Sequence, residues 1–174
     1  MNRSVKLASM VCGLWAAGAL AGGNPEHVQF PDGYSESFTP YATMNRAGKE
    51  QIAKMYANDV AIASYTQSEP AASGSTLVME IYKPKKGDDG KAIVGNDGIY
   101  EIDTLAAVAV MRRNDAWDAS LPEADRLAGW GFALFEPDGT PKDNKLTCVA
   151  CHTPLQQQDY LFSHQQLTDY VKGD

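Results

Sequence analysis

Cys148-Val149-Ala150-Cys151-His152 is the stretch of this 174-residue sequence that most constrains the fold. It has the C-x-x-C-H spacing by which a c-type haem is attached to a polypeptide. On a helical turn, positions i, i+3 and i+4 share one face. Cys148 and Cys151 can therefore each bond to a vinyl group at the edge of one porphyrin, while His152 is offered to the iron as the proximal ligand. The motif predicts one covalently attached haem c, with His152 as the metal ligand.

Three other interpretations of the cysteine pair remain open. A thioredoxin-like redox site normally lies near a βαβ unit, and the surrounding sequence does not indicate one. A zinc site needs a fourth ligand, which Asp159 or His164 would have to supply. A disulfide between Cys148 and Cys151 leaves His152 without a role. The haem motif is the interpretation that uses all three residues.

The first 21 residues have the features of a secretory signal peptide. Arg3 and Lys6 form a positive region, a short apolar run extends from Leu7 to Leu20, and Ala19-Leu20-Ala21 provides an A-x-A cleavage site. A retained N-terminal anchor is the alternative. We expect cleavage and export to the periplasm, which is the compartment where haem attachment of this kind is expected.

Residues 22–174, the predicted mature chain, are long enough for one domain whose core encloses a macrocycle. Cleavage removes Cys12 and two basic residues, which lowers the formal net charge from −7 to −9. An acidic chain argues against nucleic acid and anionic membranes as partners. It permits a basic redox partner protein.

Apolar residues recur at helical spacing after Asn45, which is a suitable N-cap. We therefore expect a helix from Asn45 to about Ala63. The positions that recur at 3.6-residue intervals are Ile52, Met55, Tyr56 and Val60.

Other segments alternate like strands. Thr76–Lys83 places Met79 and Lys83 on one face and Glu80 on the other. Trp130–Glu136 has an aromatic face. Leu105–Arg112 is apolar and suits a strand, with a helix as the alternative because of its alanines. A charged, Gly-rich excursion is expected at Lys85–Gly98, and a loop or irregular helix at Asp115–Leu127. Together these segments predict an α+β fold, with one antiparallel β-sheet, flanking helices and haem at the C-terminal segment.

The sequence resembles the cytochrome P460 / cytochrome c′-β family over most of residues 22–174. The resemblance implies an antiparallel sheet of about five strands, a high-spin haem whose distal side binds small molecules, and a homodimer. The segments that carry it are Phe30-Pro31-Asp32-Gly33-Tyr34, Tyr41–Arg46, Gly74–Glu80, Gly129–Phe132, Phe135, the Cys148–His152 motif and Asp159–Phe162.

The chain departs from the family members that oxidise hydroxylamine. Those members carry a lysine, cross-linked to the porphyrin, where this chain has Met79. An arginine is expected near Ala53, and an acidic group around Val108–Met111, where no acid occurs. Hydroxylamine oxidation needs a base, and Lys83 is a weak substitute for the missing groups. The resemblance therefore favours a cytochrome that binds diatomic or nitrogen-oxide ligands, nitric oxide foremost. A hydroxylamine-oxidising enzyme and an electron-transfer cytochrome are the alternatives.

Met79 is the residue on which these alternatives differ most. Its thioether can pack over the haem as a polarizable spacer, ligate the iron as a sixth ligand, or form a cross-link in place of lysine. We expect packing.

The remaining candidates surround the motif. Trp130, Phe132 and Phe135 are expected in the haem wall or the core, where apolar cover limits water access. His164 is expected at the surface, with ligation or proton relay as alternatives. Asp159 is expected to bond to backbone N–H groups around the haem segment.

Overall fold

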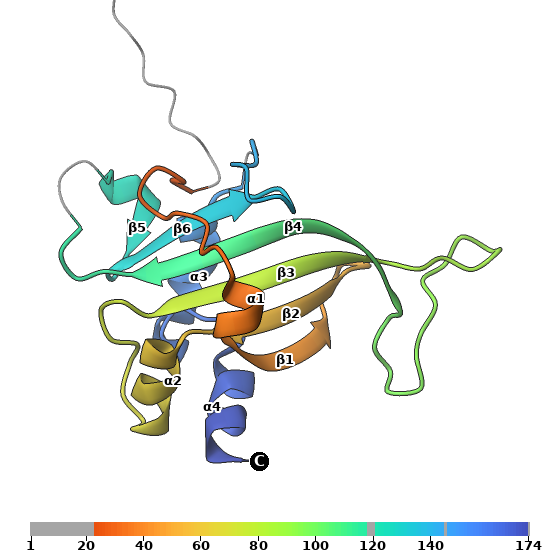
Figure 1. Cartoon of the computed structure of the whole chain (residues 1–174), viewed down its shortest axis with the longest axis horizontal. Helices are drawn as coiled ribbons and strands as arrows, with labels where there is room; N and C mark the ends of the chain where they lie inside the picture. The colour runs from red at the N-terminus through yellow and green to blue at the C-terminus, as the bar shows by residue number, and fades with distance from the viewer. Residues whose placement is uncertain (1–22, 118–120, 145, 174) are drawn as a thin grey trace, which may run out of the picture.

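The computed structural model describes residues 23–117, 121–144 and 146–173, so the predicted signal peptide lies outside the described part. One antiparallel sheet has the strand order β1-β2-β3-β4-β6-β5 (Figure 1). The strands are β1 (Thr39–Asn45), β2 (Ile52–Ala57), β3 (Thr76–Pro84), β4 (Ile102–Arg113), β5 (Arg126–Leu127) and β6 (Trp130–Phe135). The α-helices are α1 (Tyr34–Ser37), α2 (Asp59–Thr66), α3 (Cys148–His152) and α4 (His164–Lys172), and two 3₁₀ helices are η1 (Glu123–Asp125) and η2 (Thr153–Gln158).

The expected α+β fold is confirmed. The sheet has six strands rather than about five, because the two residues of β5 add a short pairing at the edge of β6. The strands expected at Thr76–Lys83, Leu105–Arg112 and Trp130–Glu136 are present as β3, β4 and β6.

The helix expected from Asn45 to Ala63 is wrong. The segment instead forms the end of β1, the strand β2 and the start of α2. Both faces of β2 are covered, so buried residues such as Ile52, Ala53 and Met55 do not alternate with exposed ones and resemble a helical spacing. The N-cap of the helix that does form, α2, is Asn58, whose Oδ1 accepts a hydrogen bond from Ala61 N at 3.1 Å.

Asn45, the expected N-cap, instead forms hydrogen bonds with the end of the excursion that was expected at Lys85–Gly98. Its side chain accepts from Tyr100 N at 2.9 Å and donates to Gly98 O at 2.9 Å. The excursion projects beyond the sheet as two reverse turns (Figure 1), closed by bonds from Gly87 N to Lys91 O and from Gly95 N to Ile99 O.

The sheet has two covered faces. The first packs against α1 and is called the α1 face; it comprises Val78, Glu80, Val108, Val110, Ala133 and Phe135. The second packs against the C-terminal segment and is called the α3 face; its central positions are Ala53, Met55, Met79, Ala109, Met111 and Phe132. Figure 1 shows α1 in front of the sheet and α3 behind it, with α2 and α4 together beyond one edge.

No helix in the described ranges combines the length and the apolar character needed to cross a membrane.

Candidate cofactor site

The short helix α3 carries the two cysteines and the histidine of the motif. Cys151 N donates to Thr147 O at 3.1 Å, which closes the turn and brings Cys148, Cys151 and His152 onto neighbouring positions. Both thiols are free, with Cys151 exposed and Cys148 partly buried. Burial raises the pKa of the Cys148 thiol. The helical turn expected from the spacing is therefore present.

The imidazole of His152 is oriented by a backbone carbonyl. Its Nδ1 lies 2.7 Å from Tyr160 O, and because a carbonyl can only accept, Nδ1 carries the hydrogen. The Nε2 atom then holds the lone pair that a metal requires. Burial also lowers the pKa of His152, which favours the neutral ring. A neutral imidazole with its other N–H bound to a carbonyl is the usual arrangement of a metal-ligating histidine, so the residues fit a haem iron.

Two aromatic rings contact this imidazole. The Phe132 ring centroid lies 4.9 Å from that of His152 at an interplanar angle of 47°, and the Phe162 centroid lies 4.9 Å away at 74°. Phe132 is buried on β6, whereas Phe162 is 63% exposed. The sequence does not identify Phe162 as a site residue, because an isolated phenylalanine after the motif has no distinguishing pattern.

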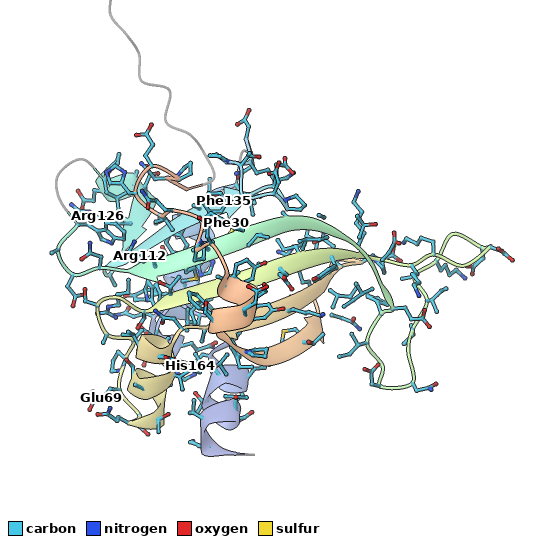
Figure 2. The ribbon with its side chains drawn as sticks, viewed as in Figure 1. Phe30, Glu69, Arg112, Arg126, Phe135 and His164 are labelled. Atoms are coloured by element: carbon cyan, nitrogen blue, oxygen red, sulfur yellow. The ribbon has the colours of Figure 1, made fainter. Side chains whose placement is uncertain are left out.

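The other two aromatic candidates, Trp130 and Phe135, have partners other than His152. Trp130 is fully buried and its Nε1 donates to Asp159 Oδ1 at 3.5 Å. Phe135 is on the opposite side of the sheet, where its ring lies 5.4 Å from that of Phe30 (Figure 2). Phe135 is thus a core residue and not part of the wall beside His152.

The α3 face presents a floor of thioethers and methyl groups. Met79 pairs across the strands with Met55 on one side and Ala109 on the other, and Met111 pairs with Phe132. Met79 is partly buried and packs against the cluster that also contains Cys148 and Val149. The floor is therefore apolar at each of these positions.

The three departures from the hydroxylamine-oxidising members fall on this floor. Ala53, expected on a helix, is fully buried as the second residue of β2. The positions of β4 on this face are Ala107, Ala109 and Met111. Lys83 lies near the end of β3 and is exposed, so it does not replace a cation at the position of Met79.

The structure bears on the alternative interpretations of the cysteine pair. Each strand pairing of the sheet, as far as the chain is described, is antiparallel, so the βαβ context of a thioredoxin-like site is lacking there. His164 begins α4, with its ring 5.8 Å from that of Tyr65 on α2 (Figure 2). Within residues 23–117, 121–144 and 146–173, no group of three His, Cys, Asp or Glu side chains is arranged to hold a metal ion.

Asp159 accepts a hydrogen bond from one backbone N–H group, but that group belongs to Ala71, whereas N–H groups of the haem segment were expected. Its Oδ2 accepts from Ala71 N and from the Tyr65 hydroxyl, each at 2.8 Å. Its Oδ1 accepts from Arg113 Nη1 at 3.4 Å and from Trp130 Nε1 at 3.5 Å. The partners lie outside the motif, in α2, the following loop, β4 and β6.

Comparison with known families gives one match. Residues 31–163 match the family model described as Cytochrome P460. The matched part is well over half of the chain and contains the whole sheet, α2 and the motif helix α3. No curated protein matches the chain.

Proposed function

The chain belongs to the cytochrome P460 family, a family of haem cytochromes, and from this premise we propose that it is an exported monohaem c-type cytochrome that binds a small neutral ligand. Nitric oxide is the foremost candidate. His152 is the proximal iron ligand in this proposal, and Cys148 and Cys151 form thioethers with the porphyrin. A haem held by these residues would supply an iron that can bind the ligand.

The observation that carries this proposal is the chemistry of the α3 face. Its central side chains, from Ala53 and Met55 to Met79, Ala109 and Met111, offer neither a charge nor a hydrogen-bond donor. Burying an anion without a counter-charge or donor is costly. A site lined by such groups selects neutral diatomic ligands over anionic ones.

The same face argues against the enzyme alternative. Oxidation of hydroxylamine releases protons along with electrons, and a positioned base must accept them. Position 79 carries methionine, position 53 a buried alanine, and the facing part of β4 only alanine and methionine. No group among these accepts a proton.

The electron-carrier alternative has one observation in its favour, which is a thioether on the correct face. Met79 is partly buried and packs against the same buried cluster as Cys148, and methionine is a known sixth ligand in cytochromes c. Met55 lies directly across the strands from it and provides a matched control, because it has the same side chain on the same face.

Absorption spectra of the full chain, produced in a host that attaches haem c, test these alternatives. We expect high-spin ferric and ferrous spectra that change on addition of carbon monoxide or nitric oxide. We also expect Met79→Leu and Met55→Leu to keep that high-spin spectrum. A low-spin wild-type spectrum that becomes high-spin only in Met79→Leu contradicts the proposal and supports the electron carrier. A strongly red-shifted reduced band would instead support the cross-linked enzyme.

Location and assembly complete the proposal. Export to the periplasm is supported by the signal-like residues 1–21, and a homodimer by the family resemblance. Fractionation of cells and size-exclusion chromatography with light scattering test the two points. Pigment that stays in the cytoplasm contradicts the first, and a monomer at micromolar concentration contradicts the second. A basic redox partner remains compatible with the acidic charge.

A further inference from the structure

We propose that Asp159 is a positioning residue for the proximal histidine: its carboxylate fixes the Tyr160 carbonyl that orients His152, and so sets the strength of the iron–histidine bond. The inference rests on the proposed function, because it requires His152 to ligate the iron.

The backbone at this point adopts an unusual conformation. Asp159 and Tyr160 have φ values of 48° and 63°, so two consecutive residues other than glycine lie in the left-handed region. This region is unfavourable for L-residues, and a sequence keeps it only where surrounding contacts enforce it. The consequence is local: the reversal turns the Tyr160 carbonyl towards His152, eight positions earlier, at 2.7 Å from Nδ1.

The contacts that enforce this conformation converge on the Asp159 carboxylate. It accepts four hydrogen bonds, from the Tyr65 hydroxyl, Ala71 N, Arg113 Nη1 and Trp130 Nε1. Its side chain is only 10% exposed, and Arg113 supplies the compensating charge. Because two of these donors belong to β4 and β6, the carboxylate fixes the reversal relative to the sheet itself.

The backbone on either side of Tyr160 is also bonded, but only locally. Tyr160 N donates to Leu155 O, and Leu161 N donates to Gln158 O, each at 2.9 Å. These bonds hold η2 and the reversal together as a unit. They do not connect that unit to the sheet. The Asp159 carboxylate makes this connection at the reversal itself, and the hydrogen bond between Ser163 Oγ and the Tyr41 hydroxyl makes a second one three residues beyond Tyr160.

The carbonyl of Tyr160 has a chemical role beyond orientation. A hydrogen bond from Nδ1–H to an acceptor increases the electron donation of the imidazole to a metal, and loss of such an outer partner weakens the metal bond. A firmly held carbonyl therefore strengthens the bond from iron to Nε2 and stabilises the ferric form. A mobile carbonyl weakens that bond and raises the reduction potential.

Two substitutions separate the carboxylate from the backbone conformation. Asp159→Gly removes all four hydrogen bonds, while glycine adopts positive φ without strain. Asp159→Asn also tolerates this conformation but leaves a single acceptor oxygen for four donors. The matched control is Asp169→Asn, because Asp169 lies on α4, where its carboxylate accepts an exposed hydrogen bond from Gln165 Nε2 at 2.7 Å.

The readouts are the iron–histidine stretching frequency of the ferrous haem protein, from resonance Raman spectra, and the reduction potential. We expect a lower frequency and a more positive potential in Asp159→Gly. Asp159→Asn should shift both in the same direction by less, and Asp169→Asn should shift neither. Thermal melts confirm that each variant is folded.

Wild-type values of both readouts in folded Asp159→Gly overturn the proposal, since the residue would then serve only the fold. If Asp159→Gly does not fold, wild-type values in Asp159→Asn overturn it equally. Absence of an iron–histidine band in the wild-type protein is a different result, because it contradicts His152 ligation and with it the proposed function. A band that is present in the wild type and shifts in the variants supports both.

Discussion

Glu80→Gln is expected to destabilise the fold without changing the cofactor site. Glu80 lies on β3, on the α1 face, and is only 6% exposed. Its Oε1 accepts from the Tyr34 hydroxyl at 2.9 Å. Its Oε2 accepts from the Tyr56 and Tyr82 hydroxyls, also at 2.9 Å each. One carboxylate therefore connects α1, β2 and β3.

The magnitude follows from the number of acceptors. A glutamine offers one oxygen, so at least one tyrosine hydroxyl loses its acceptor and the others lose a charged one. A hydrogen bond to a charged group contributes about 1.5–3 kcal/mol, and removal of the buried charge offsets part of the loss. We expect the free energy of unfolding to fall by about 2–4 kcal/mol. For a domain of this length, that corresponds to a fall in Tm of roughly 4–16 °C.

The assay is urea and thermal unfolding of the haem-loaded full chain, followed by circular dichroism, with the absorption spectrum recorded alongside. Glu101→Gln is the matched control, because Glu101 is exposed and forms only a surface ion pair with Lys85. We expect the control to change the free energy of unfolding by less than about 0.5 kcal/mol. A loss in Glu80→Gln no larger than in the control would refute the reasoning. A changed absorption spectrum would refute the assignment of Glu80 to the face away from the haem.

Three further predictions concern alkaline stability, close packing and ligation. Burial is the main cause that raises the pKa of Tyr41 and Tyr56 to about 12, above the value near 10 in the unfolded chain. The contribution of these two neutral tyrosines to the free energy of unfolding is therefore fully present below pH 10 and is lost as the pH rises towards 12. A urea midpoint that stays constant from about pH 10 to pH 12 would contradict this prediction. Gly131→Ala places a methyl group 2.7 Å from Val28 Cγ2, so unfolding measurements should show a loss of about 1–3 kcal/mol, and an unchanged Tm would refute it. His152→Ala should keep a covalently bound pigment but lose the iron–histidine band, and a wild-type ferrous spectrum would exclude His152 as the ligand.

The elements predicted correctly from the sequence are those with a strong local pattern. Trp130–Glu136 and Thr76–Lys83 alternate clearly, and the structure contains both as strands. The helix expected around Ile52 is wrong because β2 is covered on both sides, by α1 on one face and by the C-terminal segment on the other. A strand buried on both faces has no alternation to read, and its spacing then resembles that of a helix.

The same distinction applies to the candidate site. The motif helix α3 can be predicted from neighbouring residues, since the C-x-x-C-H spacing alone brings two thiols and an imidazole together. The acceptor of the His152 N–H is a backbone carbonyl, which any residue provides, so no side-chain pattern identifies Tyr160. The donors to Asp159 are likewise distant, with Tyr65 94 positions and Trp130 29 positions away along the chain. Only the three-dimensional structure brings them together.

The strand order has a consequence for the sequence of assembly. Strands β1 to β4 lie side by side in chain order, so each pairs with its predecessor in the chain, and such sequential pairing favours rapid formation. Helix α3 has five residues, which is too few to stay helical before it packs against the sheet. In the proposed cytochrome, the two thiols would therefore stay accessible for haem attachment while the sheet against which α3 packs is already formed. Packing of the C-terminal segment against the α3 face would then be the last step of assembly.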